Sequence, residues 1–333
     1  IAYRRASPAA TGAVKLTREL RALILLIVVF AAAAAKAPRI LEPSSISTIL
    51  LWIPLLTVMA VGQMLVIVSR GIDVSIGATL AFSGFSVGLM FRANPHLGLP
   101  VAVLAACGIG LAMGFVNGAL IAWVRIPAII ATLGTLSAYR GLTFILAGGG
   151  QIVRNDIPEG LTNWSIEGPF AVGAVTMPWL LIWAIVVCAI GYVFTSRTIL
   201  GRNLYAIGSN PEAAHTHGIH VSRLTVLVYS LSGMLAGLAG LLYASRYGFV
   251  NPATAGSGME LTVIAATVIG GCDVRGGSGS VLGVLIGCVL LGTINVALSV
   301  VGIEADWQLL VYGAVILLAL SLDGLLARKR VPA

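Results

Sequence analysis

The chain has 333 residues, 58% of them hydrophobic and only 10% charged, with a formal net charge of +8 at pH 7. Soluble domains carry about 25% charged residues, so the composition excludes a soluble globular protein and favours one membrane-embedded domain, residues 1–333, surrounded by lipid. The cations are dispersed between apolar runs instead of gathered on one face, which argues against a nucleic-acid partner.

Apolar runs recur along the chain and predict an all-α, polytopic integral membrane protein with about ten spanning helices. The eighth run is too short to cross a bilayer as a straight helix, so we expect it to be broken or re-entrant. The first run follows basic residues and ends in small ones, so it is either a first membrane helix or a cleavable signal peptide. The expected spans are 20–35, 46–69, 74–91, 99–123, 127–147, 177–195, 223–246, 259–270, 279–301 and 306–326.

Most cations that flank these spans fall on one side of the membrane if the N-terminus is cytoplasmic. Because cytoplasmic loops are enriched in Lys and Arg, we expect residues 1–19 and the loop 196–222 in the cytoplasm, and the loop 148–176 outside. With ten spans both termini are cytoplasmic. The external loop is either a plain connection or a functional cap over the outer mouth.

An energy source of the chain's own is missing. Lysine occurs only at Lys15, Lys36 and Lys329, and none of them follows a glycine. A phosphate-binding loop requires Gly-Lys followed by Ser or Thr, so we do not expect ATP hydrolysis by this chain. The four cysteines are scattered, and the histidines between 215 and 220 lack a set of carboxylates or thiolates, so no metal or other cofactor is expected. Transport is then passive, coupled to protons or sodium, or driven by another protein.

Residues 201–220 read GRNLYAIGSNPEAAHTHGIH, a polar stretch in an apolar chain. Asn210 is a favourable N-cap and Pro211 fits the first helical position. Glu212 suits the positive end of the helix dipole, and Gly218 permits a left-handed stop. A short capped helix suits insertion into a groove of a motor subunit, and a bulky residue at one of its alanines would block that contact. The expected coupling residues are Asn210, Pro211, Glu212, Ala213, Ala214, His217 and Gly218.

This stretch resembles the cytoplasmic coupling segment of permeases in bacterial ATP-binding-cassette importers for ribose and related monosaccharides. Residues 201–219 fill that family's frame G-x-N-x-x-A-x-G-x-N-x-x-A-A-x-x-x-G-I, and GIDVSIG at 71–77 matches its G-I-D-[LV]-S-x-G signature. A glycine-rich signature follows at 270–283, and the resemblance runs from about residue 46 to residue 326. The stretches 117–141 and 248–261 look most like the rhamnose and autoinducer-2 branch.

The resemblance implies a type II ABC importer-like fold in the bacterial inner membrane. It implies an import complex with a separate ATPase subunit, a second permease that is identical or homologous, and an external solute-binding protein. The solute would be a monosaccharide or a small polyol similar to autoinducer 2. Two rival classes stay open: a proton-coupled secondary transporter and a passive channel.

Polar residues within the spans are candidates for the solute pathway, although hydrogen bonding between helices is the alternative role for each. Arg140 is the most costly of them to bury, so we expect a partner or a wet cavity beside it. The signature corner has a similar alternative, because Asp73 could cap the following helix rather than gate transport. A weak repeat, GIDVSIG and GCDVRGG, indicates two similar corners between helices. The pathway candidates are Asn117, Thr132, Thr135, Arg140 and Asn295, and the corner residues are Gly71, Asp73, Ser75 and Gly77.

Overall fold

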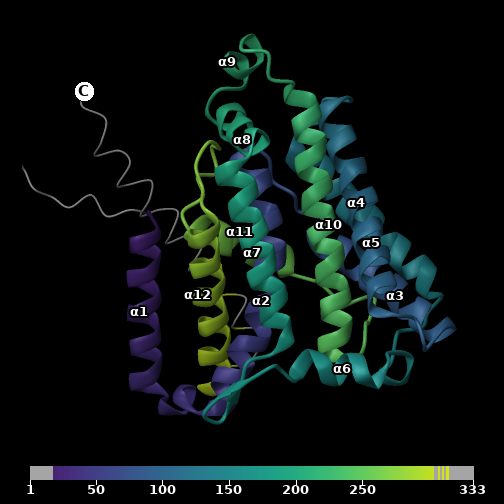
Figure 1. Cartoon of the computed structure of the whole chain (residues 1–333), viewed down its shortest axis with the longest axis vertical. Coiled ribbons are helices and arrows are strands. Elements are labelled where there is room, and N and C mark those ends of the chain that lie inside the picture. Colours follow the sequence, from purple (N-terminus) through teal and green to yellow (C-terminus); the bar gives the residue numbers. More distant parts are fainter. Residues whose placement is uncertain (1–17, 304–306, 308–309, 311–312, 315–333) are drawn as a thin grey trace, which may run out of the picture.

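The computed structural model describes residues 18–303 together with positions 307, 310, 313 and 314. These residues form upright helices that stand side by side, with short elements at both ends of the bundle (Figure 1). The expected tenth span, 306–326, lies almost entirely outside the described residues. The elements are α1 (Arg18–Lys36), η1 (Pro38–Leu41), α2 (Pro43–Val68), α3 (Ile76–Ala93), α4 (Leu99–Ala122), α5 (Ala128–Ala147), η2 (Arg154–Asp156), α6 (Glu159–Ile166), β1 (Ala171–Val172), β2 (Val175–Thr176), α7 (Trp179–Arg197), α8 (Ile199–Ser209), α9 (Pro211–Thr216), α10 (Val221–Tyr247), α11 (Met259–Ile269) and α12 (Val281–Val300).

Seven of the described helices are long and apolar enough to cross a membrane: α2, α3, α4, α5, α7, α10 and α12. The predicted all-α, multi-pass architecture is therefore confirmed, whereas a count of ten spans is not. Helix α1 stands parallel to the others but has Arg18, Glu19 and Arg21 at its start (Figure 1). Helix α11 has 11 residues, so it is about 16 Å long and covers about half of a 30 Å hydrocarbon core.

Helices α2 and α10 form the centre of the bundle. In α2 the most apolar stretch is 89% buried, whereas the corresponding figure for α4, α5 and α7 is 28%. The outer helices therefore present apolar side chains on their free faces, as expected for surfaces that meet lipid or a partner chain. Helix α10 packs against α4, α3 and α2.

Two non-helical segments enter the bundle. The first, residues 69–75, connects α2 to α3, and the second, residues 248–258, connects α10 to α11. They meet where Gly77, in the first turn of α3, packs against the backbone of Gly256 so closely that a methyl group on either glycine would collide with the other residue. Because α3 continues for 16 residues beyond Gly77, this contact lies about 24 Å from the far end of that helix.

The predicted loop 148–176 is folded. It contains η2, α6 and an antiparallel hairpin in which Ala171 pairs with Thr176. Asp156 accepts hydrogen bonds from the Arg92 guanidinium, at 2.9 Å to Oδ1 and 2.7 Å to Oδ2, and these bonds lower the pKa of the Asp156 carboxyl. Trp164 stacks on Trp179 with ring centres 5.9 Å apart. The loop is thus fastened to both α3 and α7.

Glycines allow the backbones of α4 and α10 to touch. A methyl group on Gly110 would collide with the carbonyl of Gly233, and one on Gly114 would collide with that of Tyr229. Small residues at such crossings let membrane helices approach closely and gain dispersion contacts. Gly108 lies two residues before Gly110 on α4. A methyl group there would have no neighbouring atom within 4 Å.

We predict that Gly110→Ala lowers the thermal midpoint of the detergent-purified chain, although alanine is the better helix former by about 1 kcal/mol. The added methyl group would force α4 and α10 apart, at an overpacking cost of about 1–3 kcal/mol. Gly108→Ala is the matched control and should leave the midpoint unchanged or raise it. Equal midpoints for the two variants would contradict the close helix contact.

Candidate functional site

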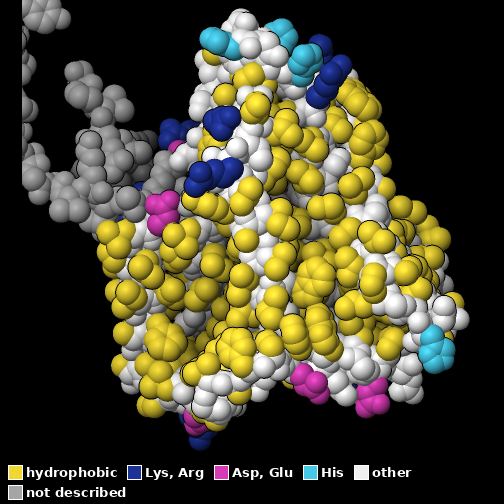
Figure 2. All heavy atoms as spheres, viewed as in Figure 1, with side chains coloured by type: hydrophobic (Ala, Val, Ile, Leu, Met, Phe, Trp, Pro, Cys, Tyr) yellow, Lys and Arg dark blue, Asp and Glu magenta, His cyan; other side chains and the backbone are white. Residues whose placement is uncertain are grey.

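Helix α9 projects beyond the spanning helices at one end of the molecule and α8 lies beneath it, and we call this end the α8–α9 face (Figure 1). In the view of Figure 2, basic and histidine side chains gather at this end, and acidic side chains lie at the opposite end and on the left flank. The polar stretch found in the sequence therefore forms a structure outside the apolar layer, attached to α7 on one side and to α10 on the other.

The capping pattern of α9 is the one that the sequence predicts. The side chain of Asn210 accepts a hydrogen bond from the Ala213 amide at 3.0 Å, and Pro211 occupies the first turn. At the other end, Gly218 adopts a φ of +80°, which is strained for residues with a side chain. His217 places Nδ1 2.8 Å from the Ala213 carbonyl oxygen. Local sequence thus specifies where this helix begins and ends.

The two alanines of α9 face different surroundings. Ala213 is exposed, whereas Ala214 is only 5% exposed and belongs to the apolar core. Of the two positions at which the sequence suggested a blocking substitution, only Ala213 has an exposed side chain. A bulky residue at Ala214 would disturb the packing of the loop instead.

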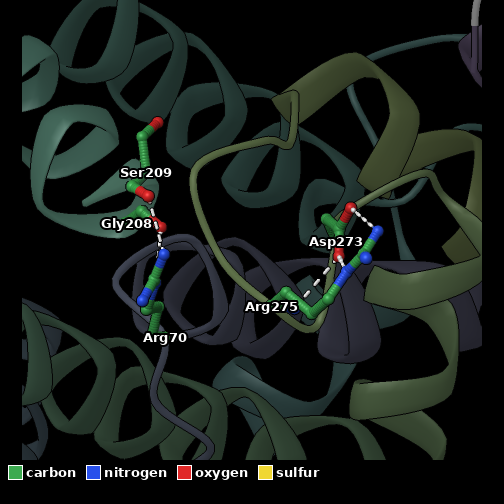
Figure 3. A network of polar contacts seen from close by, with 5 residues as sticks. All are labelled: Arg70, Gly208, Ser209, Asp273 and Arg275. Atoms are coloured by element: carbon green, nitrogen blue, oxygen red, sulfur yellow. Dashed lines mark hydrogen bonds and ion pairs between the residues drawn. The ribbon is translucent and has the colours of Figure 1, made fainter. Parts of the chain in front are cut away.

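Arg70 joins the end of α8 to the segment that follows α2. Its Nε donates to the Gly208 carbonyl at 2.7 Å and its Nη2 donates to the Ser209 carbonyl at 2.6 Å (Figure 3). The last carbonyls of a helix have no partner within the helix, and a cation there also interacts favourably with the helix dipole. Arg70 has a φ of +69°, an unusual conformation for a residue with a side chain, so its guanidinium is held in place by the surrounding structure.

The loop 270–280 completes this junction. The Gly277 amide donates to the Val68 carbonyl at 2.9 Å, and the Tyr205 hydroxyl donates to the Gly279 carbonyl at 2.8 Å. A side chain at Gly208 would collide with the backbone of Val68 and Gly277. The ends of α2 and α8 and the loop between α11 and α12 are therefore in backbone contact, and we call this contact the Arg70 junction.

The weak sequence repeat corresponds to a shared turn. Asp73 Oδ1 accepts from the Ser75 amide at 2.9 Å, and Asp273 Oδ1 accepts from the Arg275 amide at 3.0 Å. The prediction of two similar corners is confirmed, but their surroundings differ. Asp73 is 1% exposed, while Asp273 forms a solvent-facing pair with Arg275, whose pKa it raises by hydrogen bonding (Figure 3).

A buried polar cluster surrounds the first of these corners. The Ser75 hydroxyl donates to Asp73 Oδ1 at 2.7 Å and accepts from Asn117 Nδ2 at 2.8 Å. The side-chain amide of Gln63 lies 3.2 Å from both the amide nitrogen and the carbonyl oxygen of Asp73, and pairs with both when its oxygen faces the amide. Ser75 of the same corner therefore binds the Asp73 side chain, while Gln63 of α2 lies against the Asp73 backbone.

Helix α5 closes the cluster from the other side. The Thr132 hydroxyl lies 3.2 Å from the Ile72 carbonyl oxygen and 2.9 Å from that of Ala128. The Tyr139 hydroxyl donates to the Met113 carbonyl at 2.8 Å and lies 3.4 Å from Asn117 Oδ1. We call the set Gln63, Asp73, Ser75, Asn117, Thr132 and Tyr139 the buried corner.

The predicted pathway residues occupy three places. Asn117 and Thr132 belong to the buried corner, and Thr135 lies one turn further along α5. Arg140 instead donates from Nη1 to the carbonyls of Pro252 at 3.1 Å and Ala255 at 2.7 Å, so it binds the segment 248–258. Asn295 lies on α12, which packs against α1, α2 and α11.

Sequence reasoning missed three contributors: Gln63, Arg70 and Tyr139. Gln63 carried a signal, since a polar amide within an apolar span needs a partner. Arg70 also carried one, as it directly precedes the G-I-D signature, but its acceptors are 138 and 139 residues away in the chain. Nothing local distinguished Tyr139 from an ordinary aromatic core residue.

Comparison with known proteins agrees with this arrangement. The family described as "Branched-chain amino acid transport system / permease component" matches residues 45–320. The chain is 35% identical to the autoinducer 2 import system permease protein LsrC of Salmonella typhimurium strain LT2, over 92% of this chain and 86% of the relative. The identity is 37% for the LsrC protein of Enterobacter sp. strain 638 and 34% for that of Escherichia coli K12, each over 92% of this chain and 87% of the relative.

These matches confirm the resemblance to importer permeases that the motifs at 71–77 and 201–219 carried, with the autoinducer-2 relatives among the expected branches. They assign no catalytic activity, since the family and its members are transport components. A bundle of apolar helices, a polar segment outside it and a match over most of the chain lead to one conclusion: the chain belongs to the family of branched-chain amino acid transport system permease components.

Proposed function

We propose that this permease is the membrane subunit of an ATP-driven importer for autoinducer 2 or a closely similar small polyol. One observation carries the proposal: helix α9 exposes Glu212 and Ala213 at one end of the molecule, and the Arg70 junction connects α8 to the segment that leads into the buried corner. The names of the relatives, autoinducer 2 import permeases, support the choice of solute.

The α8–α9 face is the cytoplasmic one in this proposal. Basic side chains concentrate at that face, and the rule that cytoplasmic loops are enriched in cations supports the assignment. The folded loop 148–176 then lies outside, where it would meet an external solute-binding protein. The tenth span and cytoplasmic termini belong to the same proposal.

The Arg70 junction would transmit a conformational change from the ATPase subunit to the buried corner. A separate ATPase subunit that binds α9 differently in its nucleotide-bound and nucleotide-free forms would shift the permease between two states, because a ligand shifts only an equilibrium whose states it binds unequally. Displacement of α8 would move Gly208 and Ser209, and with them Arg70. The corner residues 71–75 follow Arg70 directly, so the buried corner would rearrange as well.

A second permease, identical or homologous, would complete the pathway. Helices α4, α5 and α7 leave most of their apolar surface uncovered, which supports a partner chain on part of this surface and lipid on the rest. Asn117, Thr132 and Thr135 are small and neutral, and such residues suit passage of a polyol better than tight binding.

One observation favours a second candidate, a proton-coupled transporter. Asp73 is a buried carboxylate within the bundle, and such residues mark proton relays in secondary transporters. The amide and the hydroxyl of Ser75 both donate to its Oδ1, which supports a fixed structural group over a relay. Uptake driven by a proton gradient without ATP would favour the second candidate.

We predict that the purified chain hydrolyses no ATP alone and gains vanadate-sensitive hydrolysis and uptake of autoinducer 2 only with its ATPase subunit. The physical reason is the absence of a Gly-Lys phosphate loop. The measurement is ATP hydrolysis and solute accumulation in proteoliposomes that contain the external binding protein. Hydrolysis by the chain alone, or accumulation without ATP, would rule the proposal out.

We predict that Ala213→Trp releases the ATPase subunit and lowers uptake at least about tenfold, a loss equivalent to about 1.4 kcal/mol of binding. Ala213 is exposed on α9, so the indole would block the contact without disturbing the core. The control is Ala171→Trp, an exposed alanine on the hairpin at the opposite face. Co-purification of the ATPase with each variant is the measurement, and normal retention by Ala213→Trp would mean that α9 is only a capped loop.

A further inference from the structure

A cavity of about 200 Å³ lies between α2, the end of α10 and the start of α11. It is at the end of α10 that is remote from α8 and α9, and the segment 248–258 forms one of its walls. Apart from this segment, the wall is mainly aromatic and contains one cation. The lining includes Trp52, Tyr243, Arg246, Tyr247, Thr254 and Ser257.

The aromatic rings are arranged around the cation. Tyr243 and Tyr247 have ring centres 4.5 Å apart, and the guanidinium carbon of Arg246 lies 4.7 Å from the centre of the Tyr247 ring. A cation over an aromatic face is attracted by the ring quadrupole, but this contact uses no N–H donor. The N–H groups of Arg246 Nη1 thus remain available to donate to an acceptor.

Arg246 has a hydrogen-bond donor without an acceptor in this cavity. Its Nη1 is buried and has no hydrogen-bond partner among the described residues. By contrast, Arg140, which also contacts the segment 248–258, donates to the carbonyls of Pro252 and Ala255. A buried donor without an acceptor costs about 1–3 kcal/mol, and more when it is charged. A molecule that enters the cavity and carries an acceptor would remove this cost.

The lining restricts what this molecule can be. Arg246 requires acceptor oxygens, the hydroxyls of Thr254 and Ser257 both donate and accept, and the rings of Trp52 and the two tyrosines suit a carbon skeleton. A volume of about 200 Å³ equals the space of about seven waters, which fits a polyol of about five or six carbons but not a disaccharide.

We propose that this cavity is a transient binding site for the polyol solute on its way through the permease, with Arg246 donating to the hydroxyl oxygens. The inference deepens the proposed function and rests on it. It also connects the solute to the coupling route, because Gly256 lines the cavity and packs against Gly77, two residues from Ser75 of the buried corner. A solute in the cavity would therefore contact the segment 248–258, which packs against the start of α3 next to the buried corner.

The test uses the full chain in lipid nanodiscs and saturation-transfer difference NMR with autoinducer 2, D-ribose and L-rhamnose as separate probes. At least one polyol should give a signal, and Arg246→Met should abolish it, because methionine keeps the apolar stem and removes the donors. Arg154→Met is the matched control, an exposed arginine at the same end of the molecule, and should keep the signal. Arg246→Met also removes the contact with the Tyr247 ring, so the thermal midpoint is measured in parallel to show that the variant is folded.

Several outcomes would overturn the inference: no polyol signal in the wild-type chain, equal signals from wild type and Arg246→Met, or displacement of the polyol by inorganic phosphate, which would indicate an anion site. ATP-driven uptake is measured in parallel with the ATPase subunit and the binding protein. Intact uptake in wild type and in Arg246→Met would refute only the assignment of the cavity as a solute site. No ATP-driven uptake in wild type would refute the proposed function.

Discussion

The structure depends on one constraint: backbone groups that leave a helix inside the apolar layer must find partners within the protein. Hydrocarbon offers no hydrogen bonds, and each unsatisfied group costs several kcal/mol. The segments 69–75 and 248–258 both face this problem. Gln63 pairs with the backbone of Asp73, Thr132 reaches the Ile72 carbonyl, and Arg140 binds the carbonyls of Pro252 and Ala255. Polar side chains at membrane depth are therefore first of all parts of the architecture.

The same constraint makes these segments suitable for transport. A continuous helix moves as a rigid rod, but a non-helical segment held by side chains can change its partners and adopt a second arrangement. The two segments touch at Gly77 and Gly256, so a change in one is felt by the other. One of them contains Arg70, which holds the end of α8, and the other borders the cavity of Arg246. The proposed motor contact and the proposed solute site are thus connected through two glycines.

Local patterns in the sequence predicted the structural features that depend only on neighbouring residues. The caps of α9 were readable from Asn210, Pro211 and Gly218, and the short eighth span was readable from its length. Contacts between distant segments were not readable, as the burial of Ala214 and the acceptors of Arg70 illustrate. Arg140 is an intermediate case, because its need for a partner was evident while the identity of that partner depends on a fold that brings α5 against residues 252–255.

Labelling of the corner in the assembled complex tests the central claim, that α8 moves the buried corner through Arg70. A cysteine replaces Ile72 in a chain without its native cysteines, and its reaction rate with a maleimide is measured before and after vanadate traps nucleotide on the ATPase. The account predicts a change of about tenfold, within the usual range of coupling between sites, that disappears in Arg70→Met while the ATPase stays bound. Arg125→Met is the control, since Arg125 shares the left-handed backbone, with a φ of +64°, but lies between α4 and α5. An equal change with and without Arg70 would contradict the account.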